Sequence, residues 1–201
     1  MGSSTASRPK PLVLAVTGTS GAGKGTLEQA LLRRPEFELA VSATTRERRP
    51  GEREGREYYF ISDEEFTRLV DEGKFIEHIR HPWGPRHGTL WSEIERIQAA
   101  SRVPVLDLET EGALAIQKRI PNTVTVFVRA PTFDELERRL RERATESGGE
   151  IEERLDAARD QLELADRFDH VIVNDDAERA SRELVEIADR ALEAAGSMSR
   201  R

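Results

Sequence analysis

Short apolar runs alternate along the chain with longer segments in which apolar positions recur every three or four residues. Such runs are typical of strands that a parallel sheet buries on both faces, and the recurring positions are typical of helices that cover a sheet. The runs that predict strands are residues 12–17, 103–108, 124–128 and 171–173. Because strands and helices alternate, the pattern predicts an α/β fold with a doubly wound parallel sheet.

The expected helices carry start signals and apolar stripes. Thr132 and Glu135 form a capping box, in which the side chains satisfy free backbone N–H groups at a helix start, and apolar positions follow over 133–140. Two more stripes occupy residues 151–162 and 184–192. These three segments are therefore predicted to be helices packed on the sheet.

The segment from residue 42 to residue 91 has a different character. Residues 42–60 are dense in Arg, Glu, Gly and Pro, and a second capping box follows at Ser62 and Glu65. Residues 75–79 then form a strand-like run. This pattern indicates an insertion with a small sheet of its own.

Composition narrows the classes of function. The 201 residues carry 31 basic and 38 acidic side chains, a net charge of −7, which provides no general attraction to nucleic acid or to an anionic membrane. No apolar run approaches the roughly 18 residues of a spanning helix. The absence of cysteine excludes thiolate chemistry and fits a cytoplasmic location. A phosphate ligand would therefore need a local basic cluster.

A glycine-rich segment with the spacing GxxxxGK directly follows the first predicted strand and precedes a helical pattern. Glycines let backbone N–H groups converge on phosphate oxygens, the helix N-terminus adds a favourable field, and the lysine reaches the β- and γ-phosphates. A plain glycine turn is the alternative, but the strand before it and the helix after it favour a P-loop NTPase-type three-layer fold. The predicted triphosphate-binding residues are Gly18, Ser20, Gly21, Ala22, Gly23, Lys24, Gly25 and Thr26. Gly25 stands where such loops usually place a magnesium-binding hydroxyl, which comes here one residue later, at Thr26.

Several motifs in one order resemble those of guanylate kinases, and the resemblance runs from about residue 12 to about residue 192. They are the glycine loop, the segment Ser42–Glu52 that reads SATTRERRPGE, the FIE run at 75–77, the arginine spacing at 139–146 and the VIVND run at 171–175. A solvated Arg/Glu loop would explain residues 42–52 alone, but not the ordered set. The resemblance implies an ATP-dependent kinase that phosphorylates GMP, and also dGMP.

The resemblance also implies roles for individual side chains. Ser42, Glu77 and Thr89 would read guanine, which presents an N1–H and an amine to a carboxylate. The remaining GMP-binding residues would be Arg46, Arg49, Glu52, Tyr58, His87, Asp107 and Glu109, with Arg46, Arg49 and Tyr58 on the phosphate. This chain departs from the family pattern at His87, where a tyrosine is usual, and at Glu109, where an aspartate is usual.

The same resemblance supplies the expected catalytic set and cofactor. Lys24, Arg49, Arg139, Arg143 and Arg154 would neutralise the transferring phosphoryl group, and Asn174 and Asp175 would lie near adenine. The resemblance places the arginines at 138–154 on a lid that closes over the triphosphate. An ordinary salt-bridged helix surface is the alternative for these arginines, and we prefer this alternative for Arg138 and Arg141. A helix-capping turn is the alternative for residues 174–175. Mg²⁺ would be held by Thr26 and Asp107 through water. No general base is needed, because the attacking phosphate oxygen is already charged.

The expected layout is a core of residues 12–41, 92–142 and 161–195, a GMP-binding insertion at 42–91, a lid at 143–160, a disordered tail at 1–11 and a frayed tail at 196–201. The departures from the family pattern at His87 and Glu109 leave an alternative open: a kinase of the same fold that acts on another phosphorylated acceptor. A non-catalytic interaction module of this fold is a further alternative, which the intact Lys24 and lid arginines disfavour. The expected partners are ATP and GMP, without nucleic acid or membrane; homo-oligomers stay open.

Overall fold

The computed structural model describes residues 12–80, 84–143 and 148–198. Most helices and strands lie where the apolar pattern predicts them. Their bounds, in chain order, are β1 Val13–Gly18, α1 Lys24–Leu31, β2 Phe37–Leu39, β3 Ser42–Thr44, β4 Tyr59–Phe60, α2 Asp63–Asp71, β5 Phe75–Arg80, β6 Arg86–Leu90, α3 Trp91–Ala99, β7 Val103–Asp107, α4 Thr110–Arg119, β8 Thr123–Arg129, α5 Phe133–Arg143, α6 Gly148–Glu163, the 3₁₀ turn η1 Ala165–Arg167, β9 His170–Val173 and α7 Ala177–Met198.

The core is a parallel sheet of five strands in the order β2-β7-β1-β8-β9. β1 lies at its centre, with Leu14 opposite Val105 on one side and Val124 on the other. Every residue of β1 is buried, because helices cover both faces of the sheet. This placement puts the end of β1, and the loop that follows it, between two neighbouring strands at the switch point where α/β folds bind ligands.

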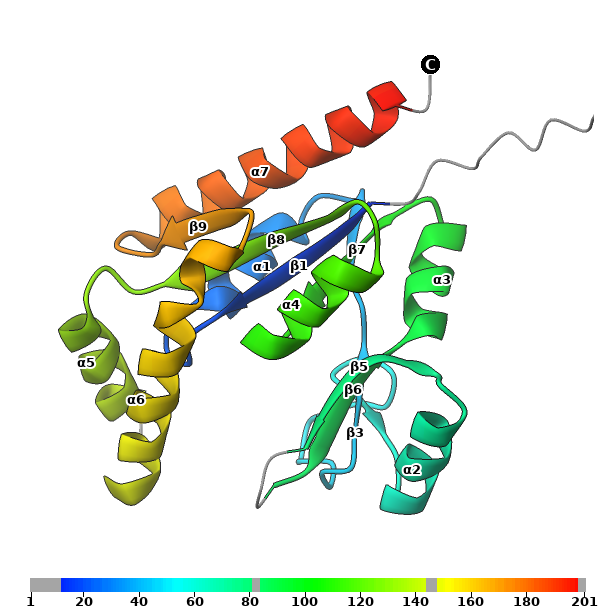
Figure 1. Cartoon of the computed structure of the whole chain (residues 1–201), viewed down its shortest axis with the longest axis horizontal. Helices are drawn as coiled ribbons and strands as arrows, with labels where there is room; N and C mark the ends of the chain where they lie inside the picture. The colour runs from blue at the N-terminus through cyan, green and yellow to red at the C-terminus, as the bar shows by residue number, and fades with distance from the viewer. Residues whose placement is uncertain (1–11, 81–83, 144–147, 199–201) are drawn as a thin grey trace, which may run out of the picture.

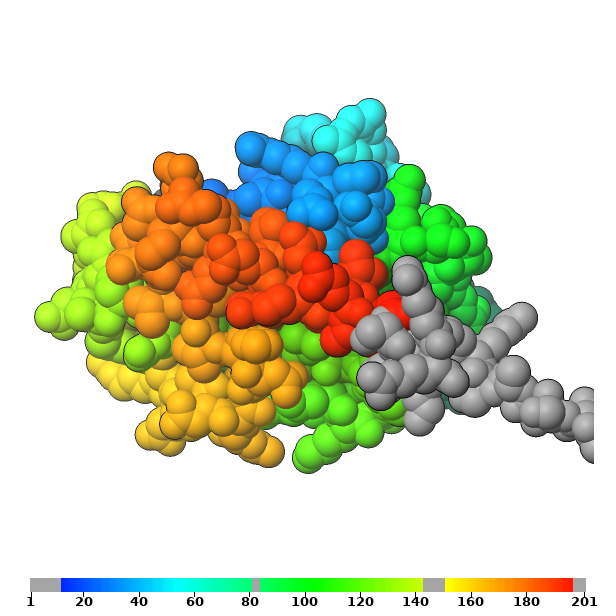
Figure 2. Space-filling view, turned by 90° about the horizontal axis from the view of Figure 1, so that it is seen from above, coloured from blue at the N-terminus to red at the C-terminus, as the bar shows by residue number. Residues whose placement is uncertain are grey.

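Two helical layers enclose the core sheet (Figure 1). On one face Leu14 and Val16 pack against Leu27 of α1 and Leu184 of α7. On the other face the apolar side chains of β1 and β7 meet those of α3 and α4. The view from above shows α7, in orange and red, lying beside the blue segment that contains α1 (Figure 2). The α/β class with a parallel core sheet is therefore confirmed.

A second sheet lies to one side of the core, in the order β4-β3-β6-β5. β3 pairs with β6 and β5 pairs with β6 in antiparallel fashion, whereas β3 and β4 are parallel. α2 closes one face of this sheet, with Phe66 stacked on Phe75 at 4.4 Å between ring centroids. α5 and α6 lie on the opposite flank of the core in Figure 1. The strands of this sheet all come from residues 42–90.

The predicted helix starts agree with the structure, whereas several elements were not predicted, among them β2, β6, α3 and α4. The Ser62 and Thr132 hydroxyls accept the backbone N–H groups of Glu65 and Glu135, as the capping boxes require. The strand β2 has only three residues and escaped the pattern. α7 runs to Met198, so residues 196–198 are helical instead of frayed.

The expected tail at 1–11, the end at 199–201 and part of the lid, 144–147, lie outside the described residues. Among the helices that are described, none is both long and apolar enough to cross a membrane.

Candidate active site

The glycine-rich loop at residues 18–24, which we call the phosphate loop, has a backbone that only glycine can adopt at two positions. Gly18 has φ of 145°, and a Cβ there would lie 1.9 Å from the carbonyl oxygen of Val128 on β8. Gly23, at the start of α1, has φ of 89°, and its Cβ would lie 2.5 Å from the amide nitrogen of Asn174. The loop therefore curls tightly against β8 and β9 and leaves the α1 N-terminus facing outward.

A cavity of about 420 Å³ opens against this loop. A Cβ on Gly25 would meet no atom within 4 Å, so residue 25 has room for a side chain that it lacks. Backbone N–H groups at a helix start and a nearby lysine suit an anionic ligand such as a triphosphate. The cavity is lined by Thr19, Ser20, Gly21, Gly23, Lys24, Gly25, Thr26, Gln29 and Asp107.

Lys24 folds back onto its own loop. Its Nζ donates to the carbonyl oxygen of Gly18 at 3.1 Å and lies 3.9 Å from Oδ1 of Asp107. The Asp107 side chain is 49% exposed, yet it sits in a cleft whose walls restrict its hydration. This desolvation raises the pKa of Asp107; Lys24 partly offsets the increase, and Glu109 adds to it. Water and Lys24 together therefore balance the negative charge of Asp107 only in part.

A second carboxylate lies behind the loop, on the buried face of α1. Glu28 is 6% exposed, and its Oε1 accepts no hydrogen bond from the part of the chain that the structure describes. Burial, and then repulsion from Asp107, raise the pKa of Glu28 to about 8, although Lys24 acts in the opposite direction. The phosphate loop is thus backed by a group that is mostly protonated at neutral pH.

A second cavity, of about 260 Å³, lies between the core and the second sheet. Its lining is largely polar and brings together most of the side chains predicted to bind the acceptor. Lys24 and Asp107 line this cavity and the phosphate-loop cavity alike, so the two cavities meet at these residues. The lining consists of Lys24, Ser42, Tyr58, Glu77, Ile79, His87, Gly88, Asp107, Leu108 and Glu109.

Glu77 is held at the floor of this acceptor cavity. Its Oε1 accepts the backbone N–H of Thr89 at 3.0 Å, and the hydroxyls of Ser42 and Thr89 lie 3.4 Å apart. A Cβ on Gly112, in the first turn of α4, would lie 3.0 Å from the other carboxylate oxygen, so Glu77 packs directly on that glycine. Burial raises the pKa of Glu77, the hydrogen bonds from Thr89 oppose this, and Glu109 adds repulsion. A ligand with two N–H donors would satisfy this carboxylate.

Arg46 and Arg49, on the loop of residues 46–52, do not line the cavity, but Arg46 lies beside Tyr58, which does. Arg46 pairs with Glu52 at 2.7 Å and lies 5.6 Å from the centroid of the Tyr58 ring. Glu52 also accepts the backbone N–H of Arg49, whose side chain is exposed. These two bonds hold the pKa of Glu52 below its usual range. His87 packs edge-on against Tyr58 at 5.6 Å. The loop therefore holds the Arg46 guanidinium beside the cavity, where a ligand anion could replace Glu52 as its partner.

Asn174 makes its contacts within the chain. Its side chain is buried and donates to the carbonyl oxygen of Ala22 at 2.7 Å, while its own carbonyl accepts Arg139 at 3.1 Å. The side-chain amide and the backbone carbonyl of Asn174 thus fasten the phosphate loop to β9 and α5. Asp175 pairs with Arg179 at 2.7 Å at the start of α7, and the neighbouring Asp176 makes the helix-capping bond there by accepting the backbone N–H of Arg179.

The lid arginines are only partly described. Arg139 also pairs with Glu135 at 2.8 Å, and Arg154 lies exposed on α6. Arg143 ends α5, but its side chain falls outside the described part. Arg138 and Arg141, which sequence reasoning assigned to the helix surface, form exposed ion pairs with neighbouring glutamates.

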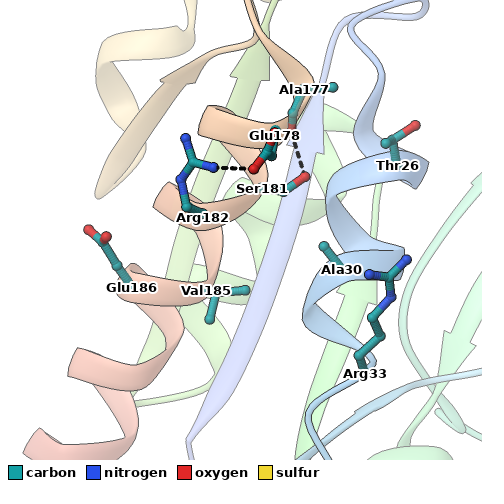
Figure 3. A pocket seen from close by; sticks show the side chains of 9 residues that line it. All are labelled: Thr26, Ala30, Arg33, Ala177, Glu178, Ser181, Arg182, Val185 and Glu186. Carbon is teal, nitrogen blue, oxygen red and sulfur yellow. Dashed lines mark hydrogen bonds and ion pairs between the residues drawn. The ribbon is translucent and has the colours of Figure 1, made fainter.

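A groove of about 550 Å³ runs between α1 and α7 and begins at Thr26, which also lines the phosphate-loop cavity. Figure 3 shows Ala30 of α1 facing Val185 of α7 across it, with Arg33 and Arg182 at its sides. Its exposed surface is mostly apolar, and charged side chains, Arg33 and Arg182 among them, stand at its edges. The groove therefore continues the phosphate cavity with a surface that suits an uncharged, flat group.

Comparisons with known proteins agree with this geometry. A family model described as guanylate kinase matches residues 8–191. A guanylate kinase of Rubrobacter xylanophilus is 43% identical over 87% of this chain and 92% of its own length. The chain belongs to the guanylate kinase family. A guanylate kinase of Mycoplasmopsis synoviae is 38% identical over 92% of this chain and 98% of its own. The crystal structure of guanylate kinase from Anaplasma phagocytophilum matches with a TM-score of 0.70 at 27% identity, covering 91% of this chain and 87% of that one.

Membership of the guanylate kinase family confirms the resemblance that the ordered motifs indicate. The individual site residues remain assignments by position and geometry. Sequence reasoning overlooked Glu28, although its place one residue after buried Leu27 and three before buried Leu31 puts it on the apolar stripe of the helix. It also overlooked Glu93, although that residue lies one position before buried Ile94 and four before buried Ile97 on α3.

Proposed function

We propose that this member of the guanylate kinase family transfers the γ-phosphoryl group of ATP to GMP or dGMP, giving ADP and GDP or dGDP. The observation that carries the proposal is the meeting of the two cavities at Lys24 and Asp107. A donor phosphate on the loop and an acceptor phosphate in the second cavity would then lie on either side of one cation. Phosphoryl transfer needs this close, in-line placement more than it needs covalent help from the protein.

The donor half of the proposal follows from the loop and the groove. The phosphates of ATP would lie on the N–H groups of residues 20–25, and the adenosine end would extend past Thr26 into the groove between α1 and α7. Ala177 lines that groove, and Asp175 precedes it by two residues, so Asp175 would lie near the adenosine end. This arrangement would bury an apolar base against apolar side chains.

The acceptor half follows from the polar cavity. Glu77 would accept the N1–H and amine of guanine, with Ser42 and Thr89 beside it. Adenine would leave that buried carboxylate unpaired, at a cost of about 1–3 kcal/mol or more. Arg46, Arg49 and Tyr58 would hold the acceptor phosphate, with Arg46 exchanging Glu52 for it, and His87 would take the place of the family's tyrosine. Specificity would therefore rest on the second sheet.

The mechanism that we propose is alignment and charge neutralisation. A phosphate oxygen of GMP is the nucleophile, so no side chain has to remove a proton. Lys24 would leave the Gly18 carbonyl for the transferring phosphoryl group, and Arg139, Arg143 and Arg154 would approach it from the lid. Arg49 would complete the cationic set from the acceptor loop. Such fixed charges are most effective where water is excluded, which is the task of a closing lid.

The residues near the point where the two cavities meet also fit Mg²⁺. Thr26 and Asp107 line the same cavity and offer the oxygen donors that Mg²⁺ prefers, and a cation would compensate the poorly solvated Asp107 carboxylate. Within the described ranges, no group of three or more His, Asp or Glu side chains could hold a metal by itself. We therefore propose that Thr26 and Asp107 hold the ion through water together with the ATP phosphates. When bound, Mg²⁺ would neutralise phosphate charge.

An ADP-release assay across GMP, dGMP, AMP, CMP and UMP tests the proposal. We expect turnover with GMP and dGMP only, and a loss of at least about 100-fold in kcat for Lys24→Met, with unchanged circular dichroism and Tm. Preference for another nucleoside monophosphate would replace the proposed acceptor. A folded Lys24→Met variant with most of its kcat would remove the phosphate loop from the mechanism. A cytoplasmic location and a role in purine nucleotide metabolism belong to the same proposal.

A further inference from the structure

A buried carboxylate that the proposed mechanism does not use lies at the joint between the two sheets. Glu93, on the first turn of α3, is 2% exposed. One of its oxygens accepts the Tyr59 hydroxyl and Arg96 Nε, both at 2.9 Å. The other oxygen accepts the backbone N–H of Val41 at 3.0 Å and Arg96 Nη2 at 2.9 Å. Both oxygens are therefore fully engaged, by partners from three separate segments.

The electrostatics of Glu93 favour its charged form. Burial alone would raise the pKa of this carboxyl, but the hydrogen bonds from Arg96, Val41 and Tyr59 hold the pKa below its usual range. A carboxylate bound in this way is a strong, charge-assisted acceptor. Loss of the charge would weaken the bonds from all three donors, those from Arg96 above all.

Each segment that Glu93 holds also carries a residue of the acceptor site. Val41 directly precedes Ser42, and Tyr59 directly follows Tyr58, and both Ser42 and Tyr58 line the acceptor cavity. Successive side chains of an extended strand point to opposite faces, so fixing Tyr59 from behind fixes the direction in which Tyr58 points. Glu93 itself follows Thr89, the partner of Glu77, on the chain that leaves β6.

The same network reaches the core sheet. Arg96 also binds Glu38 on β2 at 2.7 Å, and Arg102 binds the other oxygen of Glu38 at 2.7 Å. β2 is an edge strand of the core, and the chain passes from it through Val41 into β3 of the second sheet. Glu93 therefore connects the strands that carry acceptor residues to the sheet that carries the phosphate loop.

We propose that Glu93 is a positioning residue for the acceptor: from behind the cavity it fixes Ser42 and Tyr58 relative to the phosphate loop. The inference rests on the acceptor role proposed above for this cavity. It assigns Glu93 no contact with substrate. Its removal must therefore act on acceptor binding through the geometry of other side chains, while the ATP site, built on β1 and α1, stays in place.

The test is a comparison of KM values for Glu93→Gln, Tyr59→Phe and a matched control. The amide in Glu93→Gln keeps the size of the side chain but cannot accept both bonds from Arg96. We expect KM for GMP to rise about tenfold or more, with KM for ATP within about twofold of wild type. Tyr59→Phe removes one neutral hydrogen bond and is the milder variant, with an expected rise in KM for GMP of about fivefold. In the double variant the two effects should combine to less than their product, because both act through one contact.

Asp169→Asn provides the control. Asp169 accepts the backbone N–H and the hydroxyl of Thr125 on β8, at 2.8 Å and 2.7 Å, so it also binds backbone and hydroxyl donors, but away from the acceptor cavity. Asp169 is exposed and, unlike Glu93, pairs with no arginine among the described residues, so we expect this variant to change neither KM value by more than about twofold. All kinetics are measured where circular dichroism shows each variant to be folded, and Tyr59→Phe decides the matter if Glu93→Gln does not fold.

The outcomes separate the inference from the proposed function. Turnover of GMP by the wild-type enzyme tests the function alone. If wild type uses GMP but the variants change both KM values equally, or only lose stability, Glu93 is merely structural and the inference is wrong. If wild type prefers another acceptor, the proposed function fails, and the same comparison with that acceptor decides the role of Glu93.

Discussion

Glu28 offers a sharp test of the electrostatics behind the phosphate loop. The perturbation is Glu28→Gln, which keeps the shape of the side chain and removes its ionisation. In the folded protein the pKa of Glu28 is raised to about 8 from an ordinary value of 4.5, chiefly because the carboxyl is buried and next because Asp107 repels its charge. Folding therefore favours the protonated form.

The sign of the pH dependence follows from this direction. Between pH 4.5 and pH 8 the folded state binds more protons at Glu28 than the unfolded state does, so the free energy of unfolding falls as pH rises and then levels off above pH 8. Each pKa unit corresponds to about 1.4 kcal/mol. At pH 7 the ionisation of Glu28 in the unfolded chain thus destabilises the fold by about 3 kcal/mol, a large share of a typical stability of about 5–15 kcal/mol.

Urea unfolding of wild type and Glu28→Gln at several pH values, in EDTA and without nucleotide, measures the effect. We expect the stability advantage of the glutamine variant to grow by about 3 kcal/mol between pH 4.5 and pH 7. This growth is independent of any constant difference between a buried amide and a buried acid. Glu193→Gln, on the exposed side of α7, is the control and should parallel wild type. Parallel curves for wild type and Glu28→Gln would refute the reasoning.

Three further variants test contacts within the site. Gly112→Ala places a Cβ 3.0 Å from a Glu77 carboxylate oxygen, so KM for GMP should rise about tenfold while KM for ATP is unchanged; a selective rise in KM for ATP would contradict this. Gly25→Ser meets open space in α1, so it should add about 0.5 kcal/mol to the free energy of unfolding and lower the Mg²⁺ concentration for half-maximal rate, whereas a higher requirement would remove the metal from that position. Asn174→Ala leaves the Ala22 carbonyl without its partner, so urea unfolding should show a loss of about 1–3 kcal/mol and KM for ATP should increase; an unchanged KM would limit Asn174 to stability.

The parts of the molecule that sequence reasoning predicted correctly are those with local causes. A strand, glycines and a lysine at fixed spacing are enough to predict the phosphate loop, because the whole motif lies within a few adjacent residues, although the Val128 carbonyl that excludes a Cβ at Gly18 comes from a distant strand. Continuous apolar runs are enough for the main strands, because burial on both faces leaves no polar positions. β2 has only three residues, too few for an apolar pattern to stand out, and it is defined by its pairing with β7.

The site residues of the second sheet could be listed from the sequence, but their contacts could not be predicted. Its residues were assigned to GMP through an ordered set of motifs, not through any physical property of the loop. The motifs could not show that Glu77 packs on Gly112, or that Lys24 and Asp107 line both cavities. Those facts depend on how the insertion folds back against the core.

Local patterns and the order of the motifs are therefore enough for the family, the class of fold and most of the candidate groups. The ionisation states and the partners of these groups depend on how the chain folds. Asn174 binds the carbonyl of a residue 152 positions away, and Glu93 gathers donors from segments 52 and 34 positions distant. The physical reason is desolvation: a carboxylate keeps its ordinary pKa, or loses it as Glu28 does, according to which distant segments exclude water from it, and no local pattern records that.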